Sequence, residues 1–217
     1  MPAANTTRSE VSARFRSVAA TLAVLALGVT AASLQPGTLP AQAGPKADAP
    51  LSPELVAVRA ALDKYKDPIL AVHDGYFSSV ACLGYSQGMS GHGGMDYKAG
   101  GMGVHFLNAA NIGPKLDPMK PQVLLYEPVG DKLQLVAAEW FVPTQVSKEA
   151  PSIFGQTLQG PMAGHEPVLP EALHHWDLHV WLWKSNPSGL FSSTNPNVKC
   201  PKTGYSFDEK PPMMVTP

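Results

Sequence analysis

The segment from His174 to Trp183, with the sequence HHWDLHVWLW, constrains the fold of this chain more than any other segment does. It is rich in Trp, Val and Leu and is followed by KSNP, a pattern that predicts a β-strand from His175 to Trp183. Because side chains alternate along a strand, one face is apolar, whereas the other combines ionisable groups with indoles. Burying the second face is costly unless its polar atoms have partners, so the strand predicts a polar site beside a core. The residues of this second face are His175, Asp177, His179, Trp181 and Trp183.

The first 43 residues have the pattern of a signal peptide. Three arginines precede a short apolar run from Val18 to Val29, and Ala41-Gln42-Ala43 gives an A-x-A cleavage pattern. We therefore expect residues 1–43 to be removed, residues 44–51 to form a linker and the protein to be secreted or periplasmic. Cleavage near Ala31 and retention as an uncleaved anchor are the alternatives. The apolar run is short for a membrane span, so no stable membrane anchor is expected after processing.

Charge and cysteine usage limit the partners and the compartment. Removing residues 1–43 takes away three arginines and one glutamate, which leaves 13 basic and 16 acidic residues and a net charge of −3. This balance lacks the basic surface that binds nucleic acid, and a small-molecule ligand or a metal ion is the expected partner. The only two cysteines, Cys82 and Cys200, are predicted to form a disulfide in an oxidising compartment.

Turn residues and prolines predict a mainly β fold, since 22 prolines argue against a helical one. Ser52-Pro53 and Asp67-Pro68 each predict the start of a short helix. The predicted class is α+β, with two short N-terminal helices packed on a small antiparallel β-sandwich or open barrel. One globular domain is expected over residues 52–200, followed by a flexible tail over 201–217. Further strands are expected at Phe77–Leu83, Val104–Leu107, Val123–Glu127 and Leu133–Val142, the last two joined as a hairpin.

Three ionisable residues on these strands suggest a metal site. His105 follows a glycine-rich loop, Glu139 lies in the apolar run LVAAEWFV, and His179 lies between core-type residues. Two imidazoles and one carboxylate that meet inside a small barrel suit Zn, Fe or Mn. The alternative is that each is a hydrogen-bonded core residue. Secondary candidates for the same site are Asp177, His165 and Glu127.

Two other sites are open alternatives. Met89, His92 and Met95 lie in a glycine-rich loop, and thioether and imidazole groups suit copper. Trp181 and Trp183 could instead line a cleft of a non-catalytic ligand-binding module. No phosphate-binding loop and no dinucleotide fingerprint are present, so no nucleotide cofactor is expected. No G-x-S-x-G nucleophile motif is present either, and whether the protein is an enzyme stays open.

Five strings between Tyr65 and Cys200 resemble a family of small secreted bacterial proteins of uncharacterised activity. The resemblance implies one intact domain, and it implies no activity, cofactor or catalytic residue. The strings are GMGVHFLN at 101–108, LLYEP at 124–128, LVAAEW at 135–140, LHVWLWKSNPSGLF at 178–191 and NPNVKC at 195–200.

Overall fold

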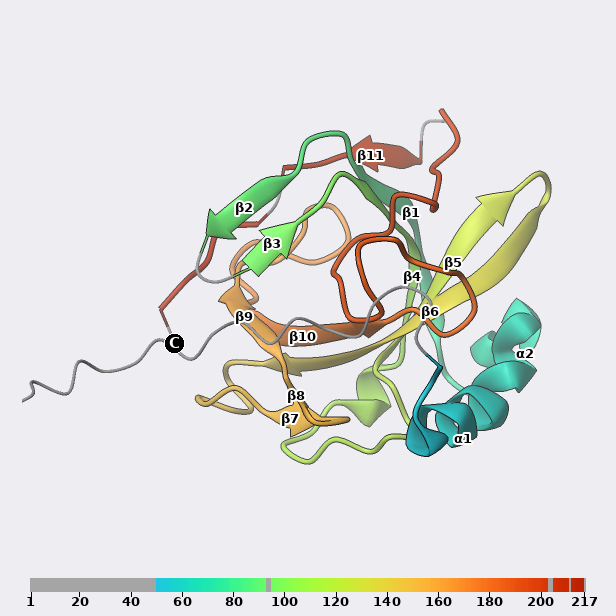
Figure 1. Ribbon diagram of the computed structural model, residues 1–217, viewed down its shortest axis with the longest axis horizontal. Helices are drawn as coiled ribbons and strands as arrows, with labels where there is room; N and C mark the ends of the chain where they lie inside the picture. Colours follow the sequence, from blue (N-terminus) through green and yellow to red (C-terminus); the bar gives the residue numbers. More distant parts are fainter. Residues whose placement is uncertain (1–49, 93–94, 203–204, 211, 217) are drawn as a thin grey trace, which may run out of the picture. The chain divides into compact units, whose positions relative to one another are not determined.

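The computed structural model describes residues 50–92, 95–202, 205–210 and 212–216, with the side chains of 89–96 left out. The chain is mainly β, with short helical segments before the first strand, which is broadly consistent with the predicted α+β class (Figure 1). The helical elements are α1 (Pro53–Leu62), η1 (Asp63–Lys66), α2 (Pro68–His73) and η2 (Ala109–Asn111). The strands are β1 (Phe77–Tyr85), β2 (Met89–His92), β3 (Met95–Tyr97), β4 (Gly100–Leu107), β5 (Val123–Val129), β6 (Lys132–Pro143), β7 (Ser152–Ile153), β8 (Gln156–Thr157), β9 (Gln159–Met162), β10 (His175–Val180) and β11 (Ser206–Asp208).

Seven strands form one curled sheet in the order β11-β1-β4-β5-β6-β10-β9. The sheet bends into a half-barrel, as Figure 1 shows. The prediction of an antiparallel sheet is wrong at one edge, because β11 runs parallel to β1 while the other neighbours in the sheet pair antiparallel. In the described part of the chain, the other pairings are the ribbons β2–β3 and β7–β8, so the architecture is a half-barrel and not a sandwich.

The helical segment begins where the sequence predicts. The Ser52 side chain accepts a hydrogen bond from the backbone N–H of Leu55 at 3.2 Å, with Pro53 in the first turn of α1. The Asp67 carboxylate caps α2 in the same way at 2.9 Å. The second element is only six residues long, which is less than two turns of helix. No helix in the described residues has both the length and the hydrophobicity needed to cross a membrane.

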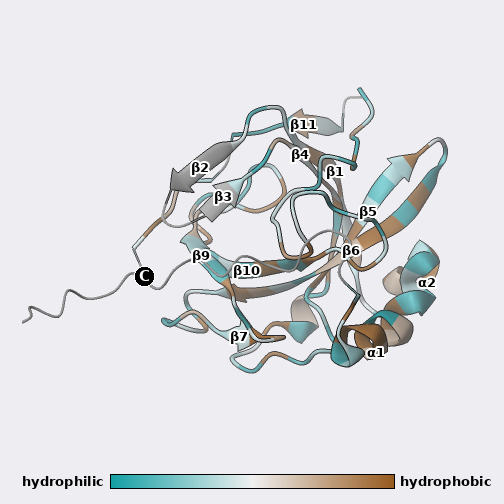
Figure 2. Cartoon of the chain, viewed as in Figure 1, coloured by the Kyte–Doolittle hydropathy of each residue, from teal (hydrophilic) through white to brown (hydrophobic). Residues whose placement is uncertain are grey.

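The sheet has two faces that differ in chemistry. One, the helix face, is apolar and shares a core with Leu55, Val58 and Leu62 of α1. Figure 2 shows that hydrophobic and hydrophilic residues alternate along the hairpin of β5 and β6. The other, the cavity face, holds apolar residues together with histidines and carboxylates. The residues of β4, β5, β6 and β10 that line the cavity are Met102, His105, Leu107, Val123, Glu139, Phe141, His175, Asp177 and His179.

The C-terminal segment is attached to the first strand. Cys82 on β1 and Cys200 form the predicted disulfide, with their Cα atoms 5.6 Å apart. The expectation of a flexible tail after Pro201 is wrong for part of that segment. Ser206–Asp208 form β11 beside β1, and Met214 makes a β-bridge with Met162. The disulfide brings this segment to the sheet edge, where its backbone groups find partners.

Gly103 permits the close contact between β4 and β5 just before His105. Its φ is +95°, and a Cβ added there would lie 2.5 Å from the carbonyl oxygen of Tyr126. We expect Gly103→Ala to lower the free energy of unfolding by about 2–4 kcal/mol, measured by urea denaturation. Gly113→Ala is the matched control, because nothing lies within 4 Å of the added Cβ. Equal stability of the two variants would contradict this role of Gly103.

Candidate metal centre

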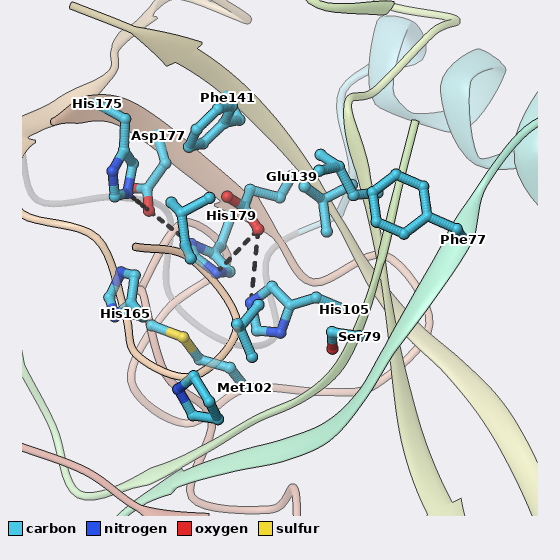
Figure 3. A pocket seen from close by; sticks show the side chains of 15 residues that line it. Phe77, Ser79, Met102, His105, Glu139, Phe141, His165, His175, Asp177 and His179 are labelled. Carbon is cyan, nitrogen blue, oxygen red and sulfur yellow. Dashed lines mark ion pairs between the residues drawn. The ribbon is translucent and has the colours of Figure 1, made fainter. Parts of the chain in front are cut away.

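The three residues of the predicted metal set lie together on the cavity face. Glu139 on β6 and His179 on β10 are direct cross-strand partners. His105 on β4 pairs with Leu125 of β5, and the curl of the sheet brings its ring to the same carboxylate. Glu139 Oε2 lies 3.8 Å from His105 Nε2 and 3.6 Å from His179 Nε2. Figure 3 shows the three side chains pointing toward one another. The structure therefore brings the three side chains together, and metal binding by them stays a prediction.

Most of the polar atoms in this group have no hydrogen-bond partner in the protein. Glu139 Oε2, both ring nitrogens of His179 and His105 Nδ1 are all buried and unpaired. The three residues are only 2–8% exposed. Leaving one such atom unpaired costs roughly 1–3 kcal/mol, and most buried polar atoms in proteins are paired. The group is therefore short of a polar or cationic partner, which a metal ion would supply.

Burial sets the protonation of these side chains. It lowers the pKa of His105 to about 4 and that of His179 to about 3, so both imidazoles are neutral at pH 7. Burial, with the Asp177 carboxylate nearby, raises the pKa of Glu139 well above its usual range. Neutral imidazoles are the form that binds metal, whereas a buried carboxylate needs a cation to stay ionised.

A cavity of about 120 Å³ adjoins the group. Its walls are largely apolar, and its ionisable members all come from the cavity face or from the loop that follows β9. A space of this size holds a small ligand or several waters beside a bound ion. The lining residues are Phe77, Ser79, Met102, His105, Leu107, Val123, Glu139, Phe141, His165, Pro167, Val168, Leu169, His175, Asp177 and His179.

Two of the secondary candidates, Asp177 and His165, belong to a second group in the same cavity. Together with His175 they place one possible ligand atom each within 4.8 Å of the others. Strand alternation placed His175 on this face, but the sequence did not identify it as a ligand. Its contact with His165 was not predictable, because strand alternation does not position a loop residue. The signal for His175 was the i, i+2, i+4 pattern of His175, Asp177 and His179.

Glu127, the remaining secondary candidate, lies elsewhere. Its Oε2 accepts a hydrogen bond from Lys184 Nζ at 2.6 Å, and its Oε1 accepts one from the backbone N–H of Lys199 at 2.9 Å. Both carboxylate oxygens are thus paired within the chain. Its assignment to the metal set is wrong, because the register of β5 and β6 places it near the hairpin end of the sheet.

The predicted tryptophan platform does not form. β10 ends at Val180, so Trp181 and Trp183 do not continue the cavity face of the strand. Trp181 is buried and donates to Ser192 O at 2.6 Å, whereas Trp183 packs against the helix-face core and donates to Asp63 Oδ1 at 2.7 Å. The two indoles therefore belong to different apolar clusters and serve the fold.

The possible copper loop is described only in its backbone. Met89 is the first residue of β2 and His92 is its last, and Met95 is the first residue of β3. The side chains of Met89, His92 and Met95 lie outside the described part of the structure. The copper hypothesis thus stays a prediction.

Comparisons with known proteins identify no relative, so the proposed function rests on the geometry of the cavity residues. No family model, no curated protein and no solved structure matches this chain.

Proposed function

We propose that this protein is an extracytoplasmic metalloprotein that binds a transition-metal ion through His105 Nε2, Glu139 Oε2 and His179 Nε2. One observation carries the proposal: His105 Nε2 and His179 Nε2 lie 3.8 and 3.6 Å from Glu139 Oε2, too far for a hydrogen bond, and both Glu139 Oε2 and His179 Nε2 are buried without a partner. Ligand atoms around one ion lie roughly 3–4 Å apart, because each bond is about 2.0–2.2 Å long.

The donor set supports a metal of intermediate softness. Two imidazoles and one carboxylate suit Zn²⁺, Fe²⁺ or Mn²⁺. Three protein ligands leave coordination positions open, and the adjoining cavity gives them space. An ion held in this way polarises a bound water or a small oxygen-containing ligand, which is the chemistry that an enzymatic role would use.

Two features support a location outside the cytoplasm. The Cys82–Cys200 disulfide requires an oxidising compartment to persist. The first 43 residues have the charge and hydrophobicity pattern of a signal peptide. Both features fit export followed by metal binding in the periplasm or the medium.

The test is the metal content of the mature protein, purified without a polyhistidine tag and measured by elemental analysis. We expect Glu139→Gln to lose one metal ion per chain relative to the wild type, since the amide is a poor ligand, with at least ~100-fold weaker binding. Glu127→Gln is the matched control: it changes a buried carboxylate of the same sheet, outside the cavity, and keeps the wild-type content. Equal metal content in wild type and Glu139→Gln would overturn the proposal.

A further inference from the structure

The cavity contains a second group with the same composition as the first. His165, His175 and Asp177 again offer two imidazoles and one carboxylate, and all three residues are buried. His175 Nε2 lies 3.8 Å from Asp177 Oδ2, and the rings of His165 and His175 have centroids 5.5 Å apart. The donor set of the proposed metal site is therefore repeated a short distance along β10.

Hydrogen bonds on the outer side of the second group orient both imidazoles. His175 Nδ1 lies 3.1 Å from the carbonyl oxygen of Leu173. Because a carbonyl only accepts, Nδ1 carries the proton and Nε2 keeps a free lone pair, which faces Asp177 (Figure 3). Histidines that bind metals in proteins have this outer hydrogen bond, which fixes the tautomer of the ring.

The ring of His165 is held by a longer chain of partners. Its Nδ1 lies 3.0 Å from the Tyr85 hydroxyl, and that hydroxyl donates to Glu209 Oε2 at 3.4 Å. If Tyr85 donates to Glu209, then His165 Nδ1 donates to the Tyr85 hydroxyl. The other ring nitrogen of His165 is then free to bind an ion.

Asp177 supplies a second, independent observation that points to a ligand. It is 1% exposed, and its Oδ1 has no hydrogen-bond partner. Its Oδ2 also lies 3.9 Å from His179 Nδ1, on the side of that ring opposite the nitrogen that faces Glu139. The imidazole of His179 thus connects the two groups: when Nε2 binds an ion, the Nδ1 proton faces the Asp177 carboxylate.

We propose that His165, His175 and Asp177 bind a second transition-metal ion, so that the cavity holds two ions. This inference rests on the proposed function, because the first ion fixes the tautomer of His179. Each ion then has one carboxylate and two imidazoles. Two ions in one cavity provide two positions for the oxygens of a single ligand, which suits a small oxyanion or carboxylate better than an uncharged ligand.

The experiment is a calorimetric titration with Zn²⁺ of the chelator-stripped mature protein, followed by dialysis and elemental analysis. We expect two Zn²⁺ per chain in the wild type and one in His175→Gln and in Asp177→Asn. His174→Gln is the matched control, because His174 precedes His175 and belongs to neither group; it keeps two. Glu139→Gln keeps one Zn²⁺, held by the second group.

The outcomes separate the two proposals. One Zn²⁺ in the wild type that Glu139→Gln loses, or two Zn²⁺ in His175→Gln and Asp177→Asn, overturns the second ion and leaves the first site standing. Two Zn²⁺ in Glu139→Gln overturns the proposed function. Loss of all zinc in both His175→Gln and Glu139→Gln shows one ion shared by both groups, which also overturns the second site. Far-UV circular dichroism and the retained ion in each single variant confirm that the variants fold.

Discussion

Excess Zn²⁺ is expected to raise the midpoint of thermal unfolding of the metal-free protein by roughly 5–10 °C for each ion that binds. An ion at ~100 times its dissociation constant contributes about 2.7 kcal/mol, and each kcal/mol shifts the midpoint by about 2–4 °C in a chain of this size. The ion also pairs buried atoms of Glu139 and His179 that otherwise have no partner. Differential scanning calorimetry with zinc and with a chelator measures the shift.

Glu139→Gln is expected to lose at least half of this shift and, in the metal-free state, to be more stable than the wild type by about 1–3 kcal/mol. The neutral amide needs no cation and can donate to the free lone pair of His179 Nε2. A carboxylate with a purely structural role gives the opposite result, a less stable metal-free variant. Glu127→Gln is expected to be less stable than the wild type in the metal-free state, because it loses the ion pair with Lys184.

The pH dependence of the metal-free protein follows from the same carboxyl group. Burial raises the pKa of Glu139 in the folded state, so the folded protein holds a proton that the unfolded chain releases above about pH 4.5. The contribution of Glu139 to stability therefore falls as the pH rises from there to the folded-state pKa. The stability advantage of Glu139→Gln over the wild type is expected to widen over the same range. An advantage that narrows with rising pH would contradict the assignment.

Removing the disulfide by the double substitution Cys82→Ala and Cys200→Ala is expected to lower the free energy of unfolding by about 4–5 kcal/mol. The bond closes a loop between residues 118 positions apart, so it restricts the unfolded chain strongly. It also holds the segment that forms β11 beside β1, where Cys82 pairs with Ser206. Urea denaturation measures the loss, which corresponds to a fall of the thermal midpoint on the order of 10 °C.

The reduced wild-type protein is the control for the disulfide, because it loses the bond but keeps both side chains in the core. A similar loss in the reduced protein and in the double variant assigns the effect to the crosslink. A loss below about 1 kcal/mol in both would contradict the account.

Local patterns predicted those parts of the fold that depend on neighbours in sequence. The Ser52 and Asp67 caps, the hairpin of β5 and β6 and the strand from His175 all follow from capping, turn and alternation rules. β11 was missed because three residues carry too weak a pattern, and their position depends on the distant disulfide. Trp181 and Trp183 were misplaced because the regular strand ends at Val180, after which the backbone N–H of Trp181 bonds to Leu190 and only that of Trp183 returns to β6, at Val136.

For the candidate metal centre too, local sequence patterns predicted some residues, whereas others depend on segments that are distant in sequence. His105, Glu139 and His179 were predictable because strand alternation places each on a definite face, and the apolar neighbours of each indicate burial. His165 lies in a loop, where no periodicity indicates direction, so its contact with His175 appears only in the structure. Glu127 had the residue type and a strand position, but its pairing with Lys184 and Lys199 depends on segments far away in sequence.

The most direct test of the central claim is an anomalous difference map from crystals of the mature protein, recorded above the absorption edge of the metal found by elemental analysis. We expect a peak about 2.0–2.2 Å from each of His105 Nε2, Glu139 Oε2 and His179 Nε2. A map with no peak at these three atoms, from crystals that contain the metal, would contradict the claim.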